Sequence, residues 1–213
     1  MLLRRESRPR EVHNHDMAEF SQGLGDAGEA HAGALLIATP LIEGPTFSRT
    51  VILLLDHGQD GSLGVVLNDV SEVSVDELVP GWERVLHPSV ALGGPVGEDA
   101  GIAVGLLSRP VVAPPPGVRR IHERWAIIDL AQDQANVAEA ISDAQLFLGY
   151  AGWDAGQLDT ELATGSWWVV PSEPGDLALG RTAGRTVMWR SILRRQPNDL
   201  RFAATYPGNP ATS

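Results

Sequence analysis

Runs of branched apolar residues, separated by glycine-rich or proline-rich turns, recur along the chain from residue 33 onward. The segment ALLIATP predicts a short buried strand that Pro40 ends. The segments TVILLLDH and SLGVVLN flank the sequence GQDG, where Gly58 and Gly61 can take positive φ, and this pattern predicts an antiparallel hairpin. Further strands are expected at SVALGG, GIAVGLL, WAIIDL, AQLFLGY and GSWWVVP.

Three segments carry the signals of helices. SVDELVPGW predicts a short helix with Ser74 as N-cap and Glu77 completing a capping box, and DQANVAEAI predicts a second helix. In TAGRTVMWRSILRRQP the apolar residues fall on one stripe, which predicts a third helix with one buried face. That face consists of Met188, Trp189, Ile192 and Leu193. The segment RPVVAPPPGVRR is expected to be a surface connection, because its prolines suit neither a central strand nor a helix.

The segment LFLGYAGWDAGQLDTEL gathers aromatic residues and glycines where a strand turns into a fourth helix. Asp154 is a candidate N-cap, and Gln157 at the third helical position can reach back to it. Trp153 and Leu158 have the spacing of a hydrophobic staple. Helix initiation alone therefore accounts for most of this segment.

Tyr150 and the glycines around it are not explained by helix initiation. Gly149 and Gly152 are expected to let the backbone turn tightly at the end of the strand. A helix N-terminus also favours anions. The junction GYAGW is therefore a candidate binding surface, with a purely structural role as the competing interpretation.

Length and composition predict one folded domain with two tails. The chain has 213 residues, of which 43% are hydrophobic, enough for one core. Residues 1–32 are polar and glycine-rich, and ordering them would cost roughly 1 to 2 kcal/mol per residue, so we expect a disordered tail. Met17 is an alternative start that would place residues 1–16 outside the native chain. The domain is assigned to residues 33–200, and residues 201–213 are expected to fray.

Charge and cysteine content narrow the function classes. The net charge of −11 argues against a general nucleic-acid surface, so direct nucleic-acid binding is not expected. The arginines near residues 190–195 are interpreted as a solvated helix end, with DNA binding as the alternative. The absence of cysteine removes thiolate nucleophiles and Cys-ligated zinc. No secretory signal or membrane-spanning run is found, which predicts a soluble cytoplasmic protein without a membrane partner.

Catalytic motifs are absent from the sequence: there is no phosphate loop, dinucleotide fingerprint, zinc-protease helix or nucleophile elbow. We therefore expect no cofactor. His13 and His15 with Asp16 form a weak metal-binding pattern in the predicted tail, and no metal site is assigned. His57 follows Asp56 near the hairpin turn and is interpreted as a strand-end histidine bonded to backbone.

The two ends of the hairpin carry different polar residues. Arg49 and Asn68 belong to the end opposite His57, so a compact site that unites them is not expected from the hairpin alone. In LGGPVGEDAG, Gly93 and Gly94 could expose backbone N–H groups to an anion. Glu98 and the adjacent Asp99 would repel that anion, which favours a plain tight loop.

Four separated segments resemble the YqgE/AlgH family of bacterial proteins. They are LLIATPLIEGPTFSRTVILL, DHGQDGSLGVVLN, GGPV and GYAGWDAGQLDTEL followed by a tryptophan-containing strand, in order between Gly33 and Leu193. The resemblance implies an α+β fold, a single compact domain with a branched, mostly antiparallel sheet curled into a pseudo-barrel and helices packed outside. It implies little about function beyond the link of the AlgH name to transcriptional regulation. After the hairpin asparagine the family commonly has a basic residue and a proline, whereas this chain has Asp69 and Val70.

These observations favour a non-enzymatic regulatory or binding module whose partner is an unknown protein or small molecule. The alternative is an enzyme of unrecognised type that uses His57, Arg49 and Asp56 around a pocket, which requires these groups within about 3 Å of one reacting atom. The candidate binding residues are Arg49, His57, Asn68, Gly93, Gly94, Tyr150, Trp153 and Gln157.

Overall fold

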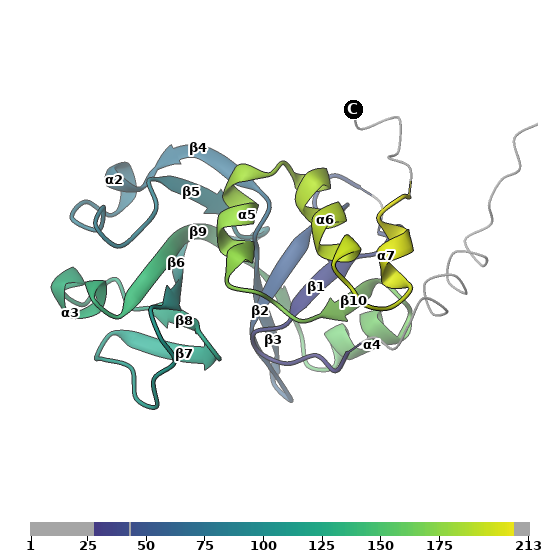
Figure 1. Cartoon of the computed structure of the whole chain (residues 1–213), viewed down its shortest axis with the longest axis horizontal. Coiled ribbons are helices and arrows are strands. Elements are labelled where there is room, and N and C mark those ends of the chain that lie inside the picture. Colours follow the sequence, from purple (N-terminus) through teal and green to yellow (C-terminus); the bar gives the residue numbers. More distant parts are fainter. Residues whose placement is uncertain (1–27, 43, 207–213) are drawn as a thin grey trace, which may run out of the picture.

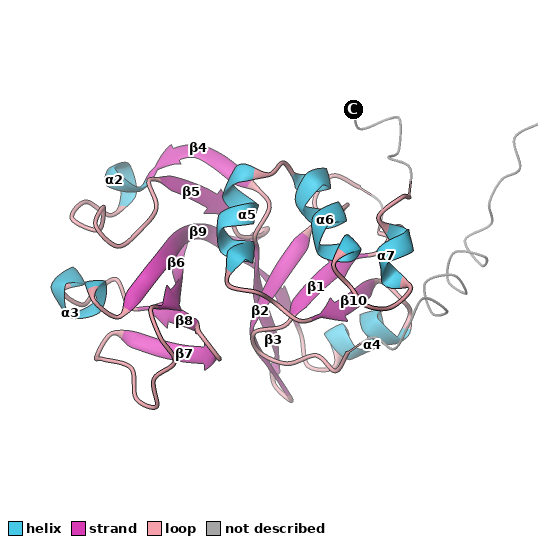
Figure 2. Ribbon diagram, viewed as in Figure 1, coloured by secondary structure: helices cyan, strands magenta, loops and turns pink. Residues whose placement is uncertain are grey.

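The computed structural model describes residues 28–42 and 44–206. The predictions for residues 1–27, including the histidine pair and the alternative start, and for residues 207–213 lie outside this part of the chain. Figures 1 and 2 show a curved sheet with helices outside it. In chain order the elements are β1 (Leu35–Ala38), β2 (Val51–Gly58), β3 (Gly61–Val66), β4 (Val70–Ser74), α2 (Val75–Leu78), β5 (Ser89–Leu92), β6 (Val96–Leu107), β7 (Val118–His122), β8 (Trp125–Ile128), α3 (Gln134–Ala138), β9 (Ile141–Trp153), α4 (Gln157–Ala163), β10 (Trp167–Val170), α5 (Gly175–Thr182), α6 (Arg185–Arg194) and α7 (Leu200–Ala203).

The sheet branches at β9. Its main path runs β10-β1-β2-β3-β9-β6-β8-β7, while β5 also pairs with β9, in parallel, and carries β4 on its far side. Leu148 of β9 is opposite Leu92 of β5, and Ala151 of β9 is opposite Gly64 of β3. The strand therefore exchanges one neighbour for another within a few residues. The predicted single α+β domain with a branched, mostly antiparallel sheet is confirmed, and the curl of the sheet gives a half-barrel.

Glycines make the branch possible. Gly149 lies between the two pairing regions with φ 68°, and a Cβ there would overlap the carbonyl oxygen of Gly94. A Cβ on Gly93 would overlap the carbonyl of Gly149 in the same way, and one on Gly94 would overlap the backbone of Tyr150. Because backbone meets backbone here, the GG sequence and Gly149 are explained by close approach.

Two faces of β1 and β2 are buried, each by different helices. Leu35 and Ile37 belong to the core cluster that includes Met188 and Trp189 of α6. Leu36 lies in a separate cluster with Leu158 of α4 on the opposite face. Figure 1 shows the corresponding arrangement, with α5, α6 and α7 in front of these strands and α4 behind them. Burial on both faces explains why β1 and β2 are continuous apolar runs instead of alternating ones.

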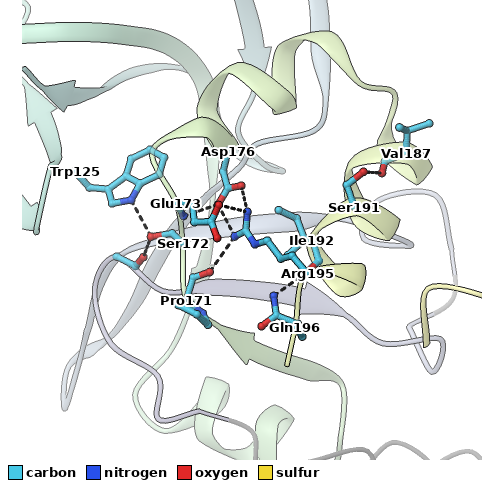
Figure 3. A network of polar contacts seen from close by, with 11 residues as sticks. Trp125, Pro171, Ser172, Glu173, Asp176, Val187, Ser191, Ile192, Arg195 and Gln196 are labelled. Carbon is cyan, nitrogen blue, oxygen red and sulfur yellow. Dashed lines mark hydrogen bonds and ion pairs between the residues drawn. The ribbon is translucent and has the colours of Figure 1, made fainter. Parts of the chain in front are cut away.

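A buried ion pair fastens α5 to the end of α6 (Figure 3). Asp176 is 1% exposed, and its Oδ2 accepts hydrogen bonds from Arg195 Nη2 at 2.8 Å and from the backbone N–H of Glu173 at 2.7 Å. Arg195 Nη2 also donates to the carbonyl of Pro171 at 3.0 Å. Beside this pair, Ser172 accepts from Trp125 Nε1 at 2.8 Å and donates to a backbone carbonyl of the loop before β1. Every partner is supplied by the chain itself.

The hairpin β2–β3, the other predicted strands and the buried stripe of α6 are confirmed. The capping box before α2 is wrong, because Ser74 makes no side-chain cap and its hydroxyl binds the carboxylate of Asp76 instead. The segment predicted as a surface connection contributes residues 118–120 to β7. The strand expected to end near Tyr150 continues to Trp153, so Gly149 and Gly152 lie inside β9.

Four elements had no predicted counterpart, namely β4, β7, α5 and α7. The strand β6 also begins earlier than expected, at Val96, with an irregularity in its pairing to β9 before Gly101. Within the described ranges no helix combines the length and the apolar character needed to cross a bilayer.

Candidate functional site

Asn68 closes the open end of the hairpin. Its side chain is buried, and its Oδ1 accepts from the backbone N–H of Val51 at 3.0 Å. Its Nδ2 donates to the carbonyls of Arg49 at 2.9 Å and Arg185 at 3.0 Å. The amide thus uses both donors and one oxygen on backbone groups, which makes Asn68 a structural link between three segments.

Arg49 lies at the same end, as predicted, and has an unusual backbone conformation with φ 57°. Its guanidinium lies 5.5 Å from the ring centroid of Trp189, and its Nη1 donates to Thr186 Oγ1 at 3.3 Å. Burial lowers the pKa of Arg49, and the positive charge of Arg190 lowers it further. These contacts direct the side chain toward α6.

His57 lies at the far end of β2, eight residues of strand away from the loop that holds Arg49. At about 3.4 Å per residue this separates the two by roughly 25 Å. His57 Nδ1 lies 2.8 Å from Ser62 Oγ, and its Nε2 lies 3.7 Å from Asp159 Oδ1. The predicted backbone bond of His57 is therefore wrong, since its partners are side chains. Asp56 is exposed beside it, and the set of His57, Arg49 and Asp56 does not converge on one reacting atom.

The turn into α4 uses different caps from those predicted. Gly156, with φ 72°, is the N-cap, and Asp154 does not cap the helix with its carboxylate. The reach of Gln157 is confirmed, because its Oε1 accepts from the backbone N–H of Asp154 at 3.0 Å. Trp153 and Leu158 are both buried in the core cluster beneath α4, as the staple spacing predicted.

A hollow of about 320 Å³ opens beside this turn. We call it the aromatic pocket. It is lined by Ile42, Phe47, Ala151, Gly152, Trp153, Gln157, Glu161, Ser166 and Trp167. The Trp167 ring meets Phe47 at a centroid distance of 5.9 Å and 79°, and Trp153 at 6.0 Å and 83°. Three rings at near-right angles therefore share one hollow, the edge-to-face arrangement that aromatic pairs prefer.

Glu161 holds the two indoles in place. Its Oε2 accepts from Trp153 Nε1 at 2.9 Å and from Trp167 Nε1 at 2.7 Å. Its Oε1 accepts from Gln157 Nε2 at 2.9 Å. A carboxylate has about four acceptor positions, so these three bonds leave one on Oε1. The carboxylate thus orients both rings beside the pocket.

A second hollow, of about 390 Å³, lies on the other side of Phe47, and we call it the acidic groove. It is lined by Thr46, Phe47, Val66, Asp69, Leu92, Gly94, Pro95, Glu98 and Leu148. Asp69 forms an ion pair with Arg185. The position where the resembling family has a basic residue is thus occupied here by an acid with its own partner.

Three of the eight predicted binding residues line these hollows. Trp153 and Gln157 line the aromatic pocket, and Gly94 lines the acidic groove. Tyr150 lines neither hollow and lies against Gly97 and Gly152. The junction GYAGW therefore contributes to the pocket through Ala151, Gly152 and Trp153.

Sequence reasoning missed Phe47, Glu161 and Trp167. One signal was present for Glu161, which lies four residues after Gln157 on α4, the spacing at which helical side chains meet. Phe47 lies in an irregular loop. Trp167 was predicted to lie within a strand. No local sequence pattern indicates that its side chain meets that of Trp153.

The fold and the pocket together define a class of protein: a single α+β domain with a branched, half-barrel sheet and a small aromatic hollow beside the β9–α4 junction. The AlgH-like family model matches residues 35–201. The chain therefore belongs to the AlgH-like family, whose function is uncharacterised.

Bacterial relatives support this assignment along most of their length. A protein of the UPF0301 family from Streptomyces avermitilis is 43% identical over 183 residues, which cover 84% of this chain and 93% of the relative. A UPF0301 protein from Thermobifida fusca is 39% identical over 194 residues and covers 84% and 93% of the two chains.

Two solved structures have the same architecture. A crystal structure of a Corynebacterium diphtheriae protein superposes with a TM-score of 0.78 at 30% identity, covering 86% of this chain and 96% of that one. The solution structure of the AlgH protein from Pseudomonas aeruginosa gives a TM-score of 0.58 at 25% identity, with coverage of 87% and 99%.

Proposed function

We propose that this protein is a non-enzymatic binding module of the cytoplasm that recognises a small molecule in the aromatic pocket. The observation that carries the proposal is the meeting of Phe47, Trp153 and Trp167 around one hollow whose only described ionisable lining residue is Glu161. A mostly apolar hollow with a few convergent polar groups is the usual form of a ligand site.

The contacts of the alternative catalytic set support a binding role. His57 and Arg49 lie at opposite ends of β2, and Asp56 is exposed beside His57. General acid–base catalysis needs such groups around one substrate atom. The pocket itself offers rings, amides and one carboxylate, which are groups that hold a ligand.

Two arginines at the ends of α6 make ion pairs within the fold, and for this reason the proposal includes no direct nucleic-acid binding. Arg195 is engaged by Asp176 and Arg185 by Asp69, within the fold. Phosphate binding would compete with these pairs, and binding through phosphates would weaken steeply with salt. An anisotropy titration with duplex DNA at low salt is expected to give no signal.

A regulatory role is the part of the proposal that follows from the AlgH name. In this role the occupied pocket changes the contacts of a protein partner. The loop that holds Phe47 borders both the aromatic pocket and the acidic groove, so a ligand in the first hollow alters a wall of the second.

The experiment that tests the binding role is a metabolite screen by ligand-observed NMR on the full chain. Hits are then measured on Trp153→Leu and on Trp82→Leu. The two tryptophans are 8% and 7% exposed, but Trp82 lies in a different core cluster. We expect binding to be lost only with Trp153→Leu. A screen without hits, or hits that both variants retain, would contradict the proposal.

A further inference from the structure

The three rings of the aromatic pocket present a surface that attracts positive charge. Aromatic faces are electron-rich and ring edges electron-poor. Both indole N–H groups, which are the polar edges of Trp153 and Trp167, are directed to Glu161 Oε2. The two indoles therefore contribute carbon atoms to the lining of the hollow. The third ring, that of Phe47, carries no polar atom at all.

The charge around the pocket has one sign. Of the described residues that line it, Glu161 alone is ionisable, and no lysine or arginine is among them. Asp159 lies on the same helix, and the whole chain carries a net charge of −11. An anionic ligand would approach Glu161 without a compensating cation, and a neutral apolar ligand would use the rings but not the carboxylate. A cation uses both.

The hydrogen-bonding capacity of the pocket selects among cations. A primary ammonium carries three N–H donors that need acceptors. Glu161 has one acceptor position left, because two indoles and Gln157 occupy the others, and the oxygen of Gln157, which accepts from Asp154, has one more. A methylated ammonium needs no acceptors and gains from each ring face that it touches.

We propose that the aromatic pocket binds a small methylated ammonium group, with Phe47, Trp153 and Trp167 as its walls and Glu161 as its counter-ion. The volume of about 320 Å³ is at the lower end for ligand pockets, which suits a headgroup of choline size. This inference rests on the proposed binding function and adds the chemical class of the ligand.

The test uses choline as the probe and follows its trimethyl proton signal by NMR against the full chain. We expect saturable binding with a dissociation constant on the order of 1 mM. The uncharged carbon analogue of choline, in which a tert-butyl group replaces the trimethylammonium, is expected to bind roughly tenfold more weakly, because it has the same shape but no charge.

Variants assign the binding to the pocket. Phe47→Leu removes one ring without disturbing the bonds to Glu161, and we expect about fivefold weaker choline binding. Phe202→Leu is the matched control, since Phe202 is 54% exposed on α7 and is expected to leave binding unchanged. Glu161→Gln keeps an acceptor for the indoles but removes the charge, and roughly tenfold weaker binding is expected.

Trp153→Phe separates the ring from its hydrogen bond. It keeps an aromatic face and loses the N–H, so choline binding should fall by no more than about threefold. Circular dichroism and thermal melting verify that each variant is folded before its binding is measured.

Three results would overturn the inference: equal binding of the uncharged analogue, tighter binding of a primary amine of the same size, or no choline binding by the folded chain at about ten times the expected dissociation constant. These outcomes are distinguishable from failure of the proposed function. Neutral or anionic ligands that depend on Trp153 would keep the pocket as the binding site while rejecting its preference for cations.

Discussion

Two carboxylates of this protein each accept several N–H hydrogen bonds but lie in different surroundings. Asp176 binds Arg195 and a backbone N–H, and it is 1% exposed between α5 and α6. Glu161 binds two indole N–H groups and an amide, and it borders a hollow of about 320 Å³. Both are held by several hydrogen bonds, and the second also lines a hollow.

The difference shows how to separate a structural carboxylate from a functional candidate. A buried carboxylate must be satisfied by hydrogen bonds, so a dense set of partners is expected whatever its role. At Asp176 the partners belong to the fold, and the side chain is 1% exposed. At Glu161 the partners are two indoles and the Gln157 amide, and all three of these side chains line the hollow. Open volume, more than the number of bonds, identifies the site.

The largest effect is expected when Asp176, the enclosed carboxylate, loses its partner Arg195. Arg195→Met would leave Asp176 buried without its cation, and we expect the free energy of unfolding to fall by about 3 kcal/mol. This is the low end of the usual range, because the Arg195 side chain is 23% exposed. Urea denaturation measures the effect. Arg194→Met, on an exposed neighbour, should change stability by less than about 0.5 kcal/mol.

Glu161→Ala is the matched change at the open carboxylate. Two indole N–H groups lose their acceptor, and we expect a loss of about 2 kcal/mol in the free energy of unfolding. The loss is smaller than for Arg195→Met because water in the hollow can replace the carboxylate oxygens. Glu161→Gln should recover most of it. A larger loss for Glu161→Ala than for Arg195→Met would reverse the proposed difference between the two environments.

A third carboxylate extends the comparison to the surface. Asp159 lies 3.7 Å from His57 Nε2 and its side chain is 66% exposed. Exposed ion pairs contribute little, so Asp159→Asn should lower stability by no more than about 0.5 kcal/mol. Equilibrium denaturation near neutral pH measures this, and a loss as large as that at Glu161 would show that exposure does not set the order.

The smallest expected effect concerns His87. Burial lowers the pKa of His87 below its usual value of 6.5, and the positive charge of Arg181 lowers it further. The unfolded chain therefore binds this proton more tightly than the folded one. Protonation of His87 therefore destabilises the fold. This loss of stability is absent above pH 6.5 and grows as the pH falls from 6.5 through the lowered pKa.

Substitution of His87 by Asn tests this sign. The variant should show a flatter decline of stability below pH 6.5 than the unmodified chain in a series of urea titrations. The same slope in both proteins, or a steeper decline for the variant, would contradict the direction of the shift.

Local sequence patterns predicted the strands whose two faces are in the same environment. The strands β1 and β2 are buried on both faces, so their apolar runs identify them directly. The strand β4 and the helix α5 were missed because VSEVS and GDLALGRT mix small, polar and apolar residues without a clear period. The strand β7 was also missed, because the proline-rich segment before it suits no strand and β7 begins only after Gly117.

The site was predictable only in part. The density of aromatics and glycines pointed to the β9–α4 junction, and Trp153 and Gln157 do line the pocket. Of its glycines, Gly149 allows the branch of the sheet, whereas Gly152 lines the pocket. Phe47 meets Trp167 because the loop between β1 and β2 crosses the start of β10, and that meeting depends on the pairing of β1 with β10. Such a long-range register leaves no trace in any short stretch of sequence.

The position of β1 has a consequence for synthesis on the ribosome. This strand is flanked by β2 and by β10, so one of its edges finds its neighbour only when residues 167–170 have been made. Until then the nascent chain presents an apolar strand edge, the form most prone to pair with other chains. We therefore expect translation speed through the last quarter of the message, and chaperones that shield such an edge, to affect the yield of native protein.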